Sequence, residues 1–149
     1  MATFERATVV DASLSTVWDF HSGIEGLLRL TPRWTGLRIE SIERPEGSPT
    51  EALTVGTIVR LRTRPGVSWT SKIVERDRER DRAMFRDELI DGPFERFEHT
   101  HWFIEIDLGT IVYDHVEFAP PRPVPAFLFR PAFASMFRDR HRRTRTILE

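Results

Sequence analysis

The chain has 149 residues, a length typical of one domain with its own hydrophobic core. Hydrophobic residues at 40% and charged residues at 30% are ordinary for a globular protein, and the formal net charge of −1 gives no general attraction to nucleic acid or to membrane surfaces. There is no cysteine, which excludes disulfides, cysteine-ligated zinc and thiol nucleophiles.

The opening residues lack the basic region and apolar run of a signal peptide. No stretch approaches the roughly 20 apolar residues that a membrane helix requires. We therefore expect no integral membrane segment and a cytoplasmic location.

The N-terminal part of the chain predicts a strand followed by two short helices. Residues 3–10 are rich in β-branched and aromatic side chains, which favours a strand. Residues 11–13 offer N-caps for a first helix, Gly23 interrupts the helical pattern, and a second helix ends before Pro32. Both helices are too short to be stable alone, so they must pack on a larger element. The residues at helical spacing are Val17, Trp18 and His21 in the first helix and Ile24, Leu27, Leu28 and Leu30 in the second.

The middle of the chain predicts six antiparallel strands separated by turns. Turn signals lie at residues 45–49, at Pro65-Gly66 and at residues 107–109. The charged run 75–82 is typical of an exposed turn. The predicted strands cover residues 37–43, 55–63, 67–74, 83–90, 97–103 and 111–118.

Alternation within these strands predicts which side chains share a face. Trp69 and Ser71 fall on one face of their strand, and we place Trp69 at a cavity wall. The next predicted strand has two rows of alternating side chains, one of which contains Phe85 and Asp87. Both rows are equally suited to face the interior, so the sequence leaves open which of them does.

The strand 97–103 carries an unusual set of side chains on one face. Phe97, His99, His101 and Phe103 alternate, so two aromatic rings and two imidazoles point the same way. If this face points inward, the protein has an apolar interior with a few polar groups, which is the composition of a small-molecule pocket.

The C-terminal part of the chain predicts a stiff proline-rich connector followed by a long amphipathic helix. We assign one face of this helix to the interior and the opposite face, rich in arginine, to solvent. The inner residues are Phe133, Met136, Phe137, His141, Thr144 and Leu148, with His141 equally suited to the stripe or to its edge. The outer ones are Arg138, Arg140, Arg142, Arg143 and Arg145.

Together the elements predict an α+β fold: a curved antiparallel sheet of about seven strands wraps around the long C-terminal helix, and the two short helices lie between strands 1 and 2. Large aromatic residues on both partners do not easily close such a shape without a gap. We therefore expect a cavity between the sheet and the C-terminal helix.

Several stretches resemble the START-like superfamily, also called SRPBCC, which includes polyketide cyclases, lipid-transfer domains and plant pathogenesis-related proteins. The resemblance rests on Phe4 with Val17-Trp18-Asp19-Phe20-His21, on Gly92-Pro93-Phe94 followed by Phe97-x-His99-x-His101-x-Phe103, and on Gly109-Thr110 with Asp114-x-Val116-x-Phe118. Relatives commonly have Trp where Phe97 stands and Tyr where Phe118 stands. The resemblance implies a helix-grip fold and one ligand-binding domain over residues 1–149.

The hairpin before the last strand decides which residue joins the two histidines. A two-residue turn places Asp114 on the face of His99 and His101, whereas a three-residue loop places His115 there. We favour Asp114, because alternate residues from Val112 onward then form an inner row.

A carboxylate beside an imidazole fixes its tautomer and raises its basicity, as general acid–base chemistry requires. The same pairing also satisfies buried hydrogen bonds, and we favour this structural or ligand-orienting role for His99, His101 and Asp114. Two histidines roughly 6.6 Å apart along a strand could begin a metal site. The sequence has no HxxxH or HExxH arrangement, however, so we expect no metal and no cofactor.

Two functions remain open at this level. The first is binding or carriage of a small hydrophobic molecule, such as a lipid, isoprenoid or aromatic metabolite. The second is a cofactor-independent polyketide cyclase or dehydratase with His99 or His101 as general base and Asp114 holding the ring. A regulatory ligand-binding domain is a third class, and whether the protein is an enzyme stays undecided.

We expect the ligand to contact a mostly aromatic set of inward-facing residues. For His21, at the end of the first helix, we favour helix capping or core packing over ligand contact. We expect no nucleic acid partner, because no exposed aromatic platform accompanies the C-terminal arginines, and we leave a homodimer open. Residues 125–129 are expected to gate the cavity. The candidate ligand-binding residues are Trp18, His21, Leu27, Trp69, Phe85, Phe97, His99, His101, Phe103, Val112, Asp114, Phe133 and Phe137.

Overall fold

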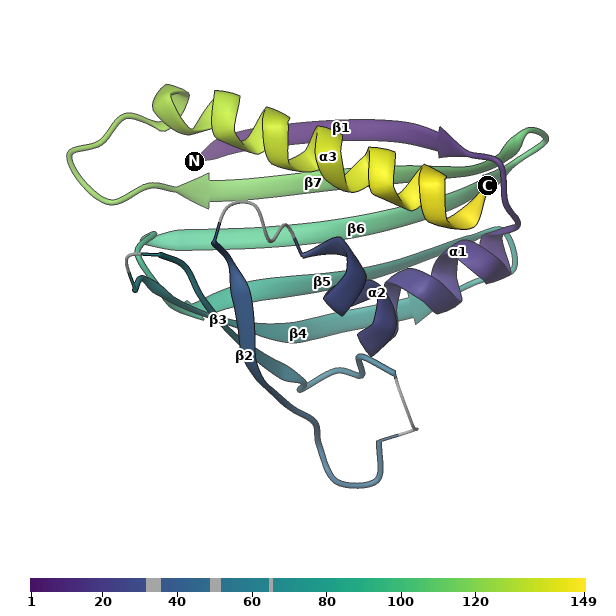
Figure 1. Ribbon diagram of the computed structural model, residues 1–149, viewed down its shortest axis with the longest axis horizontal. Helices are drawn as coiled ribbons and strands as arrows, with labels where there is room; N and C mark the ends of the chain where they lie inside the picture. The colour runs from purple at the N-terminus through teal and green to yellow at the C-terminus, as the bar shows by residue number, and fades with distance from the viewer. Residues whose placement is uncertain (32–35, 49–51, 65) are drawn as a thin grey trace.

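A curved, seven-stranded antiparallel sheet frames the protein in the computed structural model, which describes residues 1–31, 36–48, 52–64 and 66–149 (Figure 1). The strand order is β1-β7-β6-β5-β4-β3-β2, so six strands follow one another as a meander and β1 pairs with the last. This confirms the predicted α+β helix-grip architecture. The strands are β1 (Ala2–Val10), β2 (Arg38–Glu43), β3 (Ile58–Arg62), β4 (Ser68–Arg78), β5 (Arg82–Asp91), β6 (Arg96–Ile106) and β7 (Gly109–Ala119).

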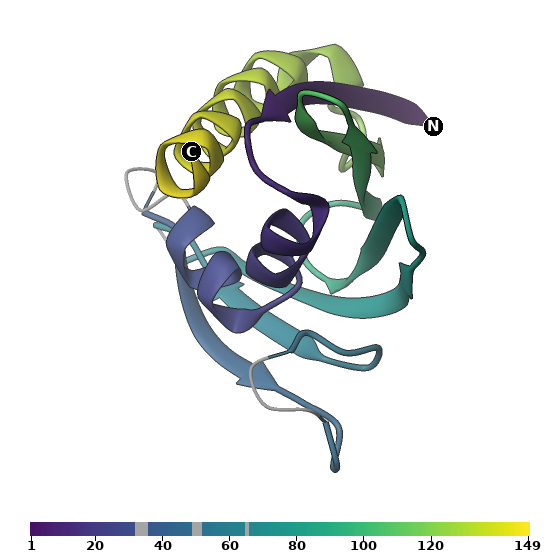
Figure 2. The same ribbon diagram turned by 90° about the vertical axis from the view of Figure 1, so that its right-hand side faces the viewer.

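The helices lie on the concave side of the sheet, as the end view shows (Figure 2). The helix α3 contacts β1 and α2, and α1 contacts β6 and β7. The Ser13 hydroxyl caps α1 by accepting a hydrogen bond from the Thr16 N–H at 3.2 Å. The helices are α1 (Leu14–His21), α2 (Ile24–Leu30) and α3 (Arg130–Leu148), and a short 3-10 helix, η2 (Ala126–Phe129), precedes α3.

The hairpin between β6 and β7 has the two-residue turn that favours Asp114. Its register pairs His101 with Asp114 and Thr100 with His115. Because residues alternate across the sheet, Asp114 is buried and His115 lies on the outer face beside Glu5. The predicted facing of Asp114 is therefore confirmed.

Several strand boundaries differ from the sequence prediction, including those around the charged run. The charged run 75–82 is mostly strand rather than turn, because β4 continues to Arg78 and β5 begins at Arg82. Cross-strand pairs such as Arg86 with Glu75 allow this run to stay extended on the solvent side. Residues Pro32, Pro49 and Pro65, on which a predicted helix end and two turns rest, lie outside the described residues.

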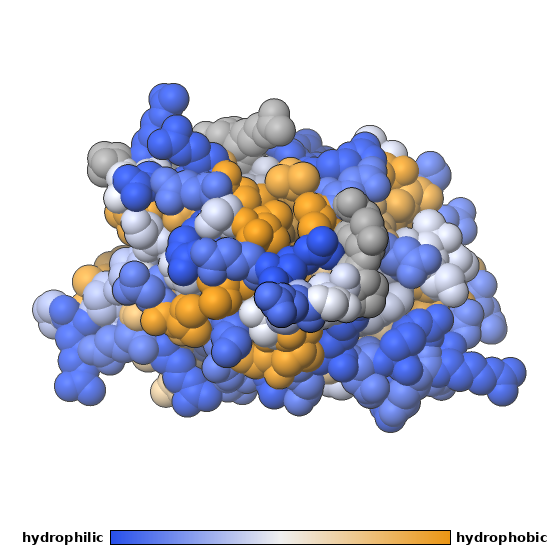
Figure 3. Space-filling model, turned by 90° about the horizontal axis from the view of Figure 1, so that it is seen from below, coloured by the Kyte–Doolittle hydropathy of each residue, from blue (hydrophilic) through white to orange (hydrophobic). Residues whose placement is uncertain are grey.

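The core divides into two clusters at opposite ends of the concave face. One joins α1 to the sheet through side chains such as Trp18 and Phe103, and the other joins α3 to the sheet through Phe118 and Phe133. At the surface, apolar residues also gather in the middle of one face, where hydrophilic residues surround them (Figure 3). Among the described residues, no helix combines the length and the apolar character that crossing a membrane requires.

Gly26 is the point of closest approach between α1 and α2, and it yields a stability prediction. A Cβ at this position would collide with the carbonyl oxygen of Phe20. Ala normally stabilises a helix relative to Gly by about 1 kcal/mol. Here we expect Gly26→Ala to lower the free energy of unfolding by about 1–3 kcal/mol, because the two helices must separate. Urea unfolding measures this.

The matched control is Glu25→Ala on the same helix, where the carboxylate is exposed and pairs with Arg29. This change is expected to stay within about 0.5 kcal/mol of the unchanged protein. Stabilisation by Gly26→Ala would contradict the close approach of the two helices.

Candidate functional site

A pocket of about 370 Å³ lies between the concave face of the sheet, α2 and α3. Small-molecule sites range over about 300–1,000 Å³, so this pocket suits a compact ligand. Its lining is mostly apolar, with a polar group of His21, Asp87, His99, His101 and Arg140. The apolar lining residues are Leu27, Leu30, Leu37, Leu53, Val59, Leu61, Val67, Trp69, Ile73, Phe85, Phe97, Phe133, Met136 and Phe137.

Asp114 is the centre of a buried hydrogen-bond network beneath the pocket. One carboxylate oxygen lies 2.7 Å from His99 Nε2, and the other lies 2.5 Å from His141 Nε2. Asp114 is 1% exposed, and both imidazoles are also buried. The network therefore joins β6, β7 and α3 through one side chain.

The ionisation of Asp114 follows from these contacts. Burial alone would raise its pKa, but hydrogen bonds from His141 and His99 outweigh burial and hold the pKa well below its ordinary value. Because the ionised carboxylate only accepts, Nε2–H of each ring must donate to it. In its neutral form, His99 then carries its lone pair on Nδ1, while the ring lines the pocket.

His101 lies between two carboxylates. Its Nε2–H donates to Asp87 at 2.9 Å, and its Nδ1 lies 3.4 Å from Asp114. Burial and the neighbouring His99 lower the pKa of His101 to about 4, so the ring is neutral at pH 7. Burial would raise the pKa of Asp87, but the hydrogen bond from His101 helps to lower it.

His21 is buried rather than cationic at the end of α1. Its Nδ1–H donates to the Val17 carbonyl at 2.8 Å, one turn earlier in the same helix. Burial, together with the charge of Arg140, lowers the pKa of His21 to about 3. The ring therefore packs in the core and presents a neutral edge to the pocket.

Asp87, His99 and His101 are the residues that come closest to a metal-binding trio, with ligand atoms within 4.8 Å of one another. The rings of His99 and His101 stack, however, with centroids 3.7 Å apart and planes 30° apart. The Nε2 atoms of these two rings are already hydrogen-bonded to Asp114 and Asp87. This arrangement suits a hydrogen-bonded network better than a metal centre.

Arg140 lines the pocket, which corrects the prediction that it lies on the outer face of α3. It follows Met136 by four residues and Phe137 by three, and this spacing places all three on the same side of a helix. The other C-terminal arginines behave differently: Arg142 and Arg143, for example, form ion pairs with Asp139. The helical spacing of Arg140 therefore indicated the inner face, but its charge led to the prediction that it faces solvent.

The structure brings most of the candidate ligand-binding residues together around the pocket. Those that line it are His21, Leu27, Trp69, Phe85, Phe97, His99, His101, Phe133 and Phe137. Trp18, Phe103 and Val112 instead belong to the core cluster under α1, because α1 covers that end of the sheet. Asp114 does not line the pocket itself and lies behind His99 and His101, which do.

Reasoning from the sequence missed Asp87 as a pocket residue and His141 as a partner of Asp114. Asp87 shares a face with Phe85, whose facing stayed open because both sets of alternating residues in β5 were equally mixed. The sequence left open whether His141 lies within the inner stripe or at its edge, and its 1% exposure shows that it lies fully inside.

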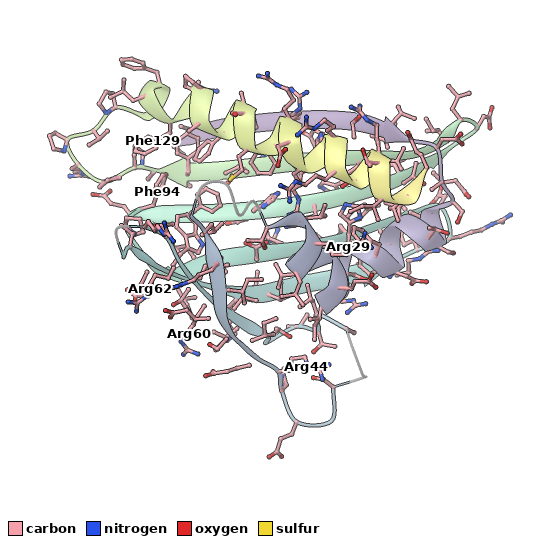
Figure 4. All side chains as sticks on the ribbon, viewed as in Figure 1. Arg29, Arg44, Arg60, Arg62, Phe94 and Phe129 are labelled. Carbon is pink, nitrogen blue, oxygen red and sulfur yellow. The ribbon has the colours of Figure 1, made fainter. Side chains whose placement is uncertain are left out.

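Aromatic rings close the end of the pocket near η2. Phe94 and Phe129 lie together there, with ring centroids 4.8 Å apart (Figure 4). Phe94 also contacts Trp69, which donates from Nε1 to the Ser71 hydroxyl at 2.9 Å. These rings join the turn before β6 to the start of α3.

Comparison with known proteins gives a family and a fold. Residues 10–145 match a family described as polyketide cyclase / dehydrase and lipid transport. No curated protein matches the chain. A START superfamily protein from Mycobacterium smegmatis is similar in structure, with a TM-score of 0.70, 12% identity and coverage of 98% of this chain and 96% of that chain.

Two further solved structures share the fold. An uncharacterised protein from Bacillus thuringiensis has a TM-score of 0.71 and 15% identity, with 99% of this chain and 98% of that chain covered. Norcoclaurine synthase from Thalictrum flavum, in complex with dopamine and hydroxybenzaldehyde, has a TM-score of 0.67 and 18% identity, with 99% of this chain and 86% of that chain covered.

The buried histidines predict acid sensitivity. A histidine has an ordinary pKa of 6.5, whereas in the folded protein His21 has a pKa of about 3 and His101 of about 4. At a pH between the folded and the unfolded pKa of such a histidine, the unfolded chain binds more protons than the folded protein. The free energy of unfolding therefore falls as pH falls. We expect a loss of about 1.4 kcal/mol per pH unit for each histidine below pH 6.5. The lowered pKa of Asp114 adds a further loss only at more acidic pH, below its ordinary value of 3.8.

Urea unfolding at pH 7, 6 and 5 measures this dependence. His21→Gln is expected to make the dependence shallower, because it removes one of the two groups. His115→Gln, on the outer face beside Glu5, shows what the loss of any imidazole does. Equal slopes in the two variants would contradict the assignment.

Proposed function

This chain belongs to the polyketide cyclase / dehydrase and lipid transport family, and on that premise we propose that it binds or carries a small hydrophobic molecule in the pocket under α3. Residues 1–149 would act as one ligand-binding domain. The observation that carries the proposal is the composition of the pocket, whose aromatic and aliphatic lining surrounds one compact group of polar side chains.

The energetics favour an apolar ligand. Burying apolar surface contributes about 25 cal/mol per Å², and side chains such as Phe137 and Ile73 are already ordered around the pocket. Ordering costs on binding are therefore reduced. The polar group at His99 and His101 would then orient one end of the ligand rather than supply most of the affinity.

The size of the pocket and a structural neighbour both support a compact ligand. A volume of about 370 Å³ is near the lower limit for small-molecule sites and suits a single-ring or few-ring molecule, or one short chain. Norcoclaurine synthase, which shares the fold, holds dopamine and hydroxybenzaldehyde. An aromatic metabolite is accordingly the preferred class here.

A cyclase or dehydratase is the alternative, and the contact between His99 and Asp114 at 2.7 Å favours it. With Nε2–H donated to Asp114, neutral His99 has a basic Nδ1 that could remove a proton from an acidic C–H of a polyketide-like substrate. Asp114 would hold the ring in this tautomer and stabilise the imidazolium. Binding is preferred, because the apolar lining is extensive and the polar side chains pair with one another in a buried hydrogen-bond network.

Filling the pocket tests the binding proposal. Val59 lines the pocket and is 5% exposed. We expect Val59→Phe to weaken binding of the neutral fluorophore N-phenyl-1-naphthylamine by about tenfold or more, about 1.4 kcal/mol. Because the added ring enters open space, stability should fall by less than the roughly 1–3 kcal/mol of an overpacked core.

The matched control is Val9→Phe, since Val9 lies on β1 and is 44% exposed. It should leave fluorophore binding unchanged. If Val59→Phe unfolds the protein while the fluorophore binds Val9→Phe and the unchanged protein only at the surface, the space between sheet and α3 is filled and the proposal fails.

Native mass spectrometry of protein purified from its own host separates carriage from catalysis. Carriage predicts a co-purified ligand of one defined mass that is recovered unchanged, and His99→Gln should still retain it. Catalysis predicts that a polyketide-like substrate is converted by the unchanged protein and accumulates unconverted on His99→Gln. Conversion that persists in His99→Gln would exclude His99 as the base.

A further inference from the structure

Arg140 is a cation at the polar group of the pocket, beside apolar lining residues. It lines the same space as Leu27, Met136 and Phe137, and its side chain is partly buried there. Within the described residues, no carboxylate or carbonyl oxygen lies at hydrogen-bond or ion-pair distance from its guanidinium. A guanidinium carries five N–H donors. Because none of these donors has an acceptor among the described residues, they are available to an acceptor on a ligand.

The nearest carboxylates do not neutralise Arg140 directly. Asp87 and Asp114 favour its charged form through space, yet Asp87 accepts from His101 and Asp114 accepts from His99 and His141. Both are thus occupied by imidazole donors. Burial lowers the pKa of Arg140 below its ordinary value, so the pocket, as it stands, disfavours this charge.

We propose that the ligand of this pocket is an amphipathic monoanion whose carboxylate binds Arg140 while its apolar body fills the space lined by Phe137, Met136 and Ile73. This inference rests on the proposed binding function. A guanidinium pairs with a carboxylate through two parallel hydrogen bonds, and such pairs are strongest where water is excluded.

One unpaired cation suits one negative charge. A phosphate dianion would bring a second charge toward Asp87, which lines the same pocket and is itself ionised. Like charges in such a site are unfavourable. A carboxylate is therefore preferred over a phosphate.

A basic groove beside the pocket supports an anionic ligand. It lies between α2 and α3 and is lined by Arg29, Arg142 and Arg143, with Thr31. Thr31 also lines the internal pocket, so the two spaces are neighbours. Figure 4 labels Arg29 beside α2. Three arginines against the carboxylates of Glu25 and Asp139 leave a positive field that would attract an anion.

Matched acids and alcohols test this inference by isothermal titration calorimetry at pH 7. The pairs are 2-naphthoate with 2-naphthalenemethanol and decanoate with decanol. We expect the unchanged protein to bind at least one acid about tenfold or more tightly than its alcohol, since charge-assisted hydrogen bonds contribute this much. Arg140→Met should reduce that ratio to about one without weakening the alcohol.

Two further variants sharpen the test. Arg138→Met removes an exposed arginine from the same helix and should preserve the preference for the acid. Arg140→Lys should keep part of the preference, because lysine retains the charge without the bidentate fork. Thermal unfolding checks that Arg140→Met folds, and it should be no less stable than the unchanged protein because an unpaired buried charge is removed.

The outcomes separate the two proposals. If the unchanged protein binds acid and alcohol equally, the carboxylate inference is wrong, while the proposed binding function still holds. This comparison requires no variant. A preference for the acid that survives in Arg140→Met would exclude Arg140 as its binding group. If the unchanged protein binds neither member of either pair, nor N-phenyl-1-naphthylamine, the proposed function itself fails.

Discussion

The buried carboxylate of Asp114, held between His99 and His141, is the interaction on which the rest of the site depends. It is a fully buried polar link between the sheet and α3, with contacts of 2.7 Å and 2.5 Å. Because His141 must face Asp114, the rotation of α3 about its axis is fixed. The preceding residue, Arg140, then points into the pocket together with Phe137, one turn earlier.

The same constraint explains why the interior has both a dry and a polar side. Aromatic residues fill the end near η2, where Phe94, Phe129 and Phe133 meet, and α1 fills the opposite end of the concave face through Trp18. Between these clusters the hydrogen-bonded network at Asp114 forms the polar floor of the pocket. A ligand with an apolar body and one polar end matches this division.

The sequence predicted much of the sheet, because the facing of strand residues follows from local alternation and turn length. Strict alternation in β6 and β7 and a two-residue turn were enough to place Asp114 beside the histidines. The facing of Asp87 was not predictable, because β5 alternates between two equally mixed sets and only its neighbours decide. Arg140 was misassigned because charge suggested solvent, while its spacing from Phe137 indicated the interior. Such conflicts between side-chain polarity and periodicity are most frequent at binding sites.

We propose that the space between the sheet and α3 is open and accepts a guest whose polar end meets the side chains around Asp114. A crystal structure of the protein grown with 2-naphthoate tests this most directly. It should show the naphthyl ring enclosed between Ile73 and Phe137 with the carboxylate at Arg140. An interior filled by repacked side chains, with 2-naphthoate found only on the outer surface, would contradict the claim.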